Sequence, residues 1–254
     1  MSNNLTSSEI RNEFLKIERK YKLLEKQIEN VYFWRLIRFS LYMRIVKEKG
    51  LWGSANAAEI KKGFISKVLY GFKYLYNAIF NSCIKGNYKR DILVFPHKRK
   101  KEIDGEYQDI HVNYLLEKLE KKNKNYEIID IPYNGDHFIL PNKKRKYDES
   151  MRFLEKIFKK LFKKPEFNKQ NITYIKKVER DLKKFTGLEF NLINRLKKRL
   201  VSFKVDYNFY LKLLKKRKPK KIYIVVSNIL HPLIADAKEL GIEVIEIQHG
   251  TILK

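Results

Sequence analysis

The sequence predicts an α/β protein in which a Rossmann-like parallel β-sheet is preceded by a helical N-terminal region. Two short apolar segments, residues 91–96 (DILVFP) and 126–132 (YEIIDIP), flank a helical segment at 111–120. A second strand–helix–strand unit runs from residue 221 to 250. Strands that alternate with helices in this order form a parallel sheet, because parallel neighbours need a crossover connection.

The N-terminal region, residues 1–88, is expected to be helical. Ser7 and Ser8 precede Glu9 and a charged run to about residue 30, which indicates a capped, solvent-facing helix. An apolar segment then ends at Gly50. Residues 64–83 carry apolar side chains at steps of three and four, which predicts an amphipathic helix with a broad aromatic stripe: Phe64, Val68, Phe72, Leu75, Ile79 and Cys83.

The Rossmann-like domain is expected to cover residues 89–254. A basic loop at 97–101 follows its first strand, and a Tyr-Asn-Gly turn follows the second. A helical insertion is expected at about 148–218, with a break at Pro165 and one long helix marked by a single apolar seam: Ile193, Leu196, Leu200, Phe203, Tyr207, Tyr210 and Leu214. The closing unit has strands at both ends and a helix that stops at Gly241.

The composition favours anionic partners and a reducing setting. Lys and Arg number 56 against 29 Asp and Glu, a formal net charge of +27, which attracts nucleic acid, anionic lipid or phosphorylated substrates. The single cysteine, Cys83, cannot form an intrachain disulfide, and no Cys/His spacing suits zinc, so we expect a cytoplasmic protein without a metal. We identify no signal peptide in residues 1–20 and no apolar run long enough to span a bilayer.

Two surface features leave alternatives open. Basic clusters at 98–101, 121–124, 143–146 and 215–221 could bind nucleic acid, but they lack interleaved aromatic residues, and we favour solvated helix faces. Nucleic acid is therefore not the partner we expect. Arg35, Arg38 and Arg44 among aromatic residues, together with the stripe at 64–83, suit peripheral docking to an anionic membrane, or simply packing within the fold.

A candidate site follows from the rule that open parallel sheets bind ligands outside the carboxyl ends of their strands. Polar residues follow each predicted strand: His97, Lys98 and Arg99; Asn134 and Asp136; Ser227 and Asn228; Gln248, His249, Gly250 and Thr251. Asp104, Asp109 and His137 fall near the same rim and are weaker candidates, since most such aspartates serve turns or caps.

His249 is the candidate general base, because its unperturbed pKa lies near neutrality. Gly250 would let the backbone approach a ligand, and Thr251 could bond a phosphate or cap a helix. The alternative is a loop histidine that is hydrogen-bonded to the backbone. Position alone does not separate these two interpretations.

The last residues, 248–254 (QHGTILK), resemble the H-G-T-x-L-K signature of bacterial CDP-glycerol glycerophosphotransferases and the I-Q-H-G signature of capsular polysaccharide glycosyltransferases. Both families have the GT-B architecture, in which an N-terminal Rossmann-like half holds the acceptor and a C-terminal half holds the nucleotide donor. The resemblance covers residues 221–254, and 91–132 in pattern only. It implies the N-terminal half of a GT-B fold with His249 as base. Ile252 stands where the glycerol-phosphate signature has proline.

The resemblance implies the acceptor-binding half of a glycosyltransferase or polyol-phosphate transferase of bacterial capsule or cell-surface polysaccharide biosynthesis, at the inner face of the cell membrane. A saccharide or lipid-linked acceptor is the expected partner, and no cofactor is expected. Because one half cannot orient both substrates, we expect the chain to be inactive without a partner chain that carries the donor domain. The alternative is a non-enzymatic basic protein that binds nucleic acid or an anionic membrane surface.

Overall fold

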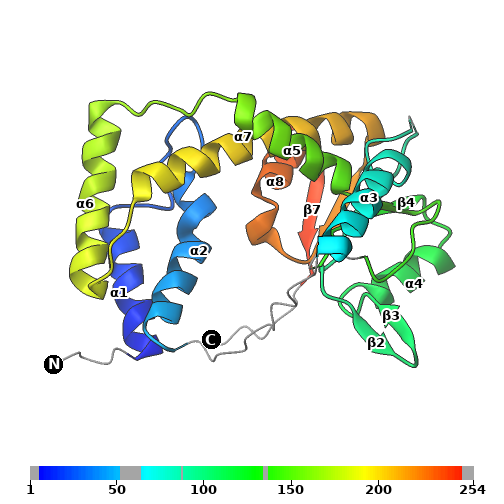
Figure 1. Cartoon of the computed structure of the whole chain (residues 1–254), viewed down its shortest axis with the longest axis horizontal. Helices are drawn as coiled ribbons and strands as arrows, with labels where there is room; N and C mark the ends of the chain where they lie inside the picture. Colours follow the sequence, from blue (N-terminus) through cyan, green and yellow to red (C-terminus); the bar gives the residue numbers. More distant parts are fainter. Residues whose placement is uncertain (1–5, 52–63, 87, 134–136, 248–254) are drawn as a thin grey trace. The chain divides into compact units, whose positions relative to one another are not determined.

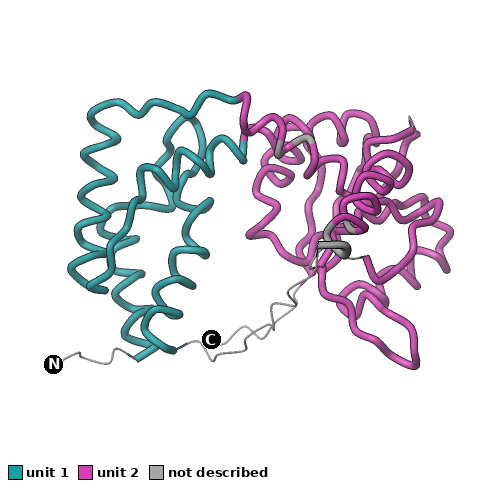
Figure 2. The backbone as a smooth tube through the Cα atoms, viewed as in Figure 1, with its two compact units in different colours: residues 1–60, 162–203 teal, residues 61–161, 204–254 magenta. Residues whose placement is uncertain are grey.

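The computed structural model describes residues 6–51, 64–86, 88–133 and 137–247. Two compact units make up the chain, and Figure 2 shows them in different colours: unit 1 is residues 1–60 and 162–203, and unit 2 is residues 61–161 and 204–254. The helices expected to form one region over residues 1–88 are thus divided between the units. The expected insertion at 148–218 is divided as well.

Unit 1 is helical. It contains α1 (Ser7–Lys20), α2 (Phe33–Glu48), α6 (Lys169–Thr186) and the first part of α7 (Leu192–Arg217). A capping box between Thr6 and Glu9 starts α1, so the cap residue is Thr6, and the predicted Ser7 and Ser8 lie inside the helix. The prediction that this helix faces the solvent is wrong. Ile10, Phe14 and Ile17 recur at helical spacing in α1 and lie buried against the other helices.

The aromatic and basic residues of α2 are used within unit 1. Trp34 is fully buried and its indole Nε1 donates to Glu18 Oε1 at 2.5 Å. Arg38 donates to the same buried carboxylate from Nε and Nη2, at 2.5 and 2.9 Å. The Arg44 guanidinium lies over the Phe190 ring. For α2, packing is therefore the observed alternative, and membrane docking is not needed to explain its composition.

Unit 2 contains a five-stranded parallel sheet, which confirms the predicted fold class. Its strand order is β5 (Arg145–Tyr147), β4 (Tyr126–Asp130), β1 (Ile92–Phe95), β6 (Lys221–Ile224) and β7 (Glu243–Glu246), and every pairing is parallel. Counted along the chain among these five strands, the order is 3-2-1-4-5, which is the doubly wound Rossmann-like order. β5 is only three residues long, and its sequence carries no strand signal.

Helices cover both faces of the sheet because successive strand residues point to opposite sides. On one face Leu93, Phe95, Ile222 and Ile224 pack against α7, α8 (His231–Glu239) and α5 (Glu149–Leu161). On the other face Ile92, Val94 and Ile128 pack against α4 (Asn113–Lys121). The strands predicted at 91–96 and 126–132 are confirmed by β1 and β4. The strand–helix–strand unit predicted from residue 221 is confirmed as far as residue 247, the last one described.

A short hairpin after β1 was not predicted. β2 (Lys101–Ile103) and β3 (Glu106–Gln108) pair antiparallel around Asp104 and Gly105, whose φ values of 52° and 80° fit a type I′ turn. The Asp-Gly pair was the sequence signal for it. Asp104 is thus a turn residue. Across the described ranges, no helix has the length and apolar character needed to cross a membrane.

A buried ion pair fixes α7 to the sheet. Arg217, the last residue of α7, and Glu127 in β4 are both fully buried, and the Arg217 Nε donates to Glu127 Oε2 at 2.7 Å. The remaining guanidinium nitrogens donate to the carbonyl oxygens of Cys83, Lys85 and Gly86. One side chain therefore holds α7, β4 and the segment before β1 together.

Replacing Arg217 with methionine should strongly destabilise the protein, because Glu127 would stay buried without its cation. Loss of one partner of a buried pair costs about 3–5 kcal/mol of unfolding free energy. The matched control is Lys220→Met, since Lys220 is 81% exposed and 3.6 Å from Asp91; it should change stability by less than about 1 kcal/mol. Equal denaturation midpoints for both variants would contradict the structural role of Arg217.

Candidate functional site

The strand order places the candidate site at the border of β1 and β6. In a doubly wound sheet, the connections after these two strands lead to opposite faces, and a crevice opens between them at the carboxyl edge. Phe95 pairs with Ile224 at this border, and Val225 N donates to Phe95 O. The predicted residues His97, Lys98 and Arg99 therefore start from the same edge as Ser227 and Asn228.

The loop after β1 is held by one buried lysine. The Lys100 side chain is 1% exposed, and its Nζ donates to His97 O and to Asp130 Oδ1, both at 2.8 Å. It also forms an ion pair with Asp109. The rest of the loop is shaped by His97, whose Nδ1 accepts from Arg99 N at 3.1 Å. Lys98 and Arg99 are left exposed at the sheet edge.

Arg99 and His97 also contact rings in the neighbouring loops. The Arg99 guanidinium lies 5.6 Å from the centre of the Tyr133 ring, which follows β4. The His97 ring meets the His111 ring edge to face at 5.4 Å. These contacts restrict where the exposed cations can reach. They favour a loop that is organised before any ligand binds.

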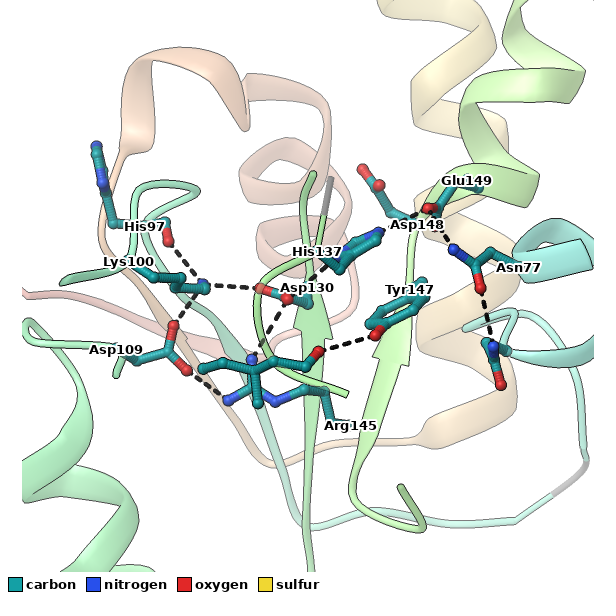
Figure 3. A network of polar contacts seen from close by, with 12 residues as sticks. Asn77, His97, Lys100, Asp109, Asp130, His137, Arg145, Tyr147, Asp148 and Glu149 are labelled. Carbon is teal, nitrogen blue, oxygen red and sulfur yellow. Dashed lines mark hydrogen bonds and ion pairs between the residues drawn. The ribbon is translucent and has the colours of Figure 1, made fainter. Parts of the chain in front are cut away.

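Asp130, the last residue of β4, is the centre of a buried polar network, shown in Figure 3. Its Oδ1 accepts from Lys100, and its Oδ2 lies 3.2 Å from His137 Nδ1 and 3.4 Å from Arg145 Nη1. Arg145 also pairs with Asp109, which begins the turn into α4. The carboxylate thus joins the loop after β1, the loop after β4 and the start of β5.

His137 links Asp130 to α5. Its Nε2 lies 2.6 Å from Glu149 Oε1, and its ring stacks on Tyr147 with 3.5 Å between centroids and a 4° interplanar angle. Both ring nitrogens face carboxylate oxygens, which can only accept, so the doubly protonated ring satisfies both contacts. Burial opposes that charge, but hydrogen bonds to Asp130 and Glu149 outweigh it and raise the pKa of His137.

The network balances its own charges. Lys100, Arg145 and protonated His137 face Asp109, Asp130 and Glu149. Burial would raise the pKa of Asp130, but its contacts with His137, Lys100 and Arg145 lower it. A buried cluster of three cations and three anions needs no ligand for neutrality. We therefore assign it to positioning of the edge loops, and the exposed Lys98 and Arg99 to ligand contact.

The residues after β6 form a short turn. Ser227 and Asn228 begin the 3-10 helix η1 (Ser227–Ile229), and Ser227 N donates to Glu246 Oε1 at 3.1 Å. This contact ties η1 to the end of β7. The Asn228 Oδ1 is buried and has no hydrogen-bond partner among the described residues. A buried acceptor without a partner is costly, so this amide is a candidate for contact with a ligand donor group.

Several predicted residues lie outside the described ranges. Gln248, His249, Gly250 and Thr251 follow β7 in the sequence, and Asn134 and Asp136 follow β4. The role of His249 therefore stays a prediction. Within the described ranges, no group of three or more His, Cys, Asp or Glu side chains could hold a metal ion.

Sequence reasoning missed most of the network. Asp130, Arg145 and Glu149 were not proposed, and Lys100 was placed in a solvated basic cluster. A signal was present for Asp130, because it is the only charged residue in the second half of the apolar run 126–132 and comes where the strand ends. A carboxylate at that position must be paired if the strand is buried.

No protein-family model, no curated protein and no solved structure matches this chain. The site is therefore defined by its own geometry.

The contribution of His137 to stability should fall as the pH rises. Its folded pKa is raised, so the stabilisation by the protonated ring is complete below the unfolded pKa of about 6.5 and is lost as the pH rises through the folded pKa. Urea unfolding of the wild type and of His137→Gln should thus differ most near pH 5 and least near pH 9. A difference that grows with pH would contradict the ionic contacts to Asp130 and Glu149.

Proposed function

We propose that this chain is the acceptor-binding half of a transferase that builds bacterial cell-surface polysaccharide, with a glycosyl or polyol-phosphate group as the transferred unit. The observation that carries the proposal is the pair of exposed cations, Lys98 and Arg99, in the loop after β1, the strand that pairs with β6. Cations at a strand-end crevice suit the diphosphate of a lipid-linked acceptor or an anionic polymer.

The sequence of the C-terminal segment supports the same site. Ile247, the last described residue before the QHGTILK motif, donates its N–H to Ile224 O at the end of β6. The motif therefore follows directly from the strand that borders η1. This is the edge at which the GT-B families that the motif resembles hold their acceptors.

The proposed reaction is a direct displacement. The acceptor hydroxyl attacks the donor carbon or phosphorus, His249 takes the hydroxyl proton, and the nucleotide leaves with the electron pair of the broken bond. Lys98 and Arg99 hold the acceptor diphosphate, and Asn228 accepts from a sugar hydroxyl. The donor nucleotide binds a separate donor domain, and the reaction takes place at the inner face of the membrane.

Removing the two exposed cations should weaken acceptor binding. Lys98→Ala with Arg99→Ala should reduce the affinity for a short-chain prenyl-diphosphate saccharide roughly tenfold, since each residue supplies a charge-assisted contact. The measurement is isothermal titration calorimetry at fixed ionic strength. Unchanged affinity would remove the observation on which the proposed function rests.

The matched control for this experiment is Lys121→Ala with Lys122→Ala. These lysines are exposed at the C-terminal end of α4, which lies at the opposite, amino edge of the sheet. The charge change is the same, so a loss of binding in both double variants would indicate non-specific attraction by the net positive charge. Tight DNA binding with a steep salt dependence would favour the non-enzymatic alternative.

His249→Ala should abolish transfer when a donor-binding domain is supplied in a longer chain or by a partner. Loss of a general base typically costs roughly 10²–10⁴-fold in rate. Transfer of label from UDP-sugars and CDP-glycerol to the lipid-linked fraction measures the rate, and the unfolding midpoint checks that the variant is folded. Wild-type rates in the folded variant would exclude His249 as the base.

A further inference from the structure

Helix α3 (Phe64–Phe80) exposes its apolar side. Seven of its apolar side chains are between 41% and 69% exposed: Val68, Leu69, Phe72, Leu75, Tyr76, Ile79 and Phe80. At 100° per residue they share one arc of roughly 140°. In an ordinary surface helix, such an arc would face the core.

The side of α3 that faces the rest of unit 2 is polar instead. Asn77 is 6% exposed, and its Nδ2 donates to Glu149 Oε1 at 3.3 Å. The Tyr74 hydroxyl donates to Glu149 O at 3.0 Å, and Asn81 donates to Asn77 Oδ1. Hydrogen bonds therefore hold the helix in place, and its apolar arc is left to solvent. This orientation is the reverse of the one that burial of apolar area would select.

Helix α5 carries further exposed apolar side chains. It packs against α3, as Figure 1 shows, and its exposed side chains include Phe153, Ile157, Phe158 and Leu161. The Tyr76 and Phe80 rings of α3 contact each other with 4.8 Å between centroids. We call these eleven exposed side chains of α3 and α5 the α3–α5 face. Exposed apolar side chains in this number mark a site of association.

The segment that contains α3 is basic and free of acidic residues, whereas α5 carries Glu149 and Glu155. Residues 61–90 include no Asp or Glu, and they carry seven basic residues: Lys61, Lys62, Lys67, Lys73, Lys85, Lys89 and Arg90. The Lys85 Nζ lies 5.4 Å from the centre of the Phe80 ring, at the end of the apolar arc. Basic residues that border an apolar arc with aromatic side chains are the signature of helices that lie in the interface of an anionic bilayer.

We propose that the α3–α5 face binds the surface of an anionic lipid bilayer, with α3 lying in the headgroup region. The apolar arc enters the boundary of the acyl chains, the tyrosine ring stays at the headgroup level, and the lysines meet lipid phosphates. A second copy of the chain would bring the same acid-free segment against itself, and the like charges would repel. Lipid phosphates complement those charges.

One carboxylate connects this face to the candidate site. Glu149 Oε1 contacts Asn77 of α3 and His137 of the buried network (Figure 3). A bilayer bound by α3 would thus lie at a fixed position relative to the loop that carries Lys98 and Arg99. The inference goes beyond the proposed function, because it requires neither an acceptor nor a transfer reaction.

The test is co-sedimentation of the full chain with vesicles of phosphatidylcholine and phosphatidylglycerol (3:1), and with vesicles of phosphatidylcholine alone. Binding should need the anionic lipid. Phe72→Ser with Phe80→Ser should lower the partition coefficient roughly tenfold or more, because two aromatic rings no longer enter the bilayer. Both positions are more than half exposed, so the variant should unfold at the wild-type midpoint.

The matched control is Tyr114→Ser with Leu140→Ser, at 69% and 80% exposed positions outside the α3–α5 face. It should bind vesicles like the wild type. Absent vesicle binding by the wild type, or equal losses in both double variants, would overturn the proposal. A dimer of the wild type in sedimentation equilibrium would also overturn the proposal, if the Phe72→Ser, Phe80→Ser variant is monomeric and still binds vesicles like the wild type. The vesicles contain no saccharide, so failure here would not count against the proposed function.

Discussion

The organisation of unit 2 depends on the need to pair a buried carboxylate at the end of a buried strand. Asp130 ends β4 between two covered faces, where an unpaired charge would be prohibitively costly. Its partners come from three directions: Lys100 from the loop after β1, His137 from the loop after β4, and Arg145 from β5. Through His137 and Glu149 the chain of contacts reaches Asn77 in α3. One desolvated group therefore fixes the loops of the candidate site and the helix that bears the exposed apolar face.

The sequence allowed much of the fold to be predicted, because periodicity reports which residues share a side. The strand β1, the long helix α7 and the β6–α8–β7 unit followed from local pattern. The predicted seam of α7 is only partly correct, since Phe203 and Tyr207 are not buried, and Val205, Phe209 and Leu213 are. Pairing over long sequence distances has no such pattern. Lys100 lies in a run of basic residues that looks solvated, and only the position of Asp130 some thirty residues later makes it a buried cation. The stripe of α3 was visible in the sequence, but periodicity does not say whether a stripe faces the core or the solvent.

The large positive charge separates into groups with different physical roles. Lys100, Arg145 and Arg217 are buried and matched by carboxylates, so they contribute to the fold and not to the external field. Lys98 and Arg99 are exposed at the carboxyl edge of the sheet, where the crevice of a doubly wound fold lies. Lys85, in the basic segment 61–90, lies beside the Phe80 ring at the end of the apolar arc of α3. An anionic acceptor at Lys98 and Arg99 and an anionic bilayer at the apolar face of α3 would suit a substrate that is itself linked to lipid.

The central claim is that an acceptor with a diphosphate group binds at the border of β1 and β6. The most direct measurement is a crystal structure of the chain with a short-chain prenyl-diphosphate saccharide. The account predicts that the diphosphate lies within hydrogen-bonding distance of Lys98 and Arg99, and that a saccharide hydroxyl donates to Asn228 Oδ1. Density for the ligand against unit 1, or at the amino edge of the sheet near Lys121 and Lys122, would contradict it.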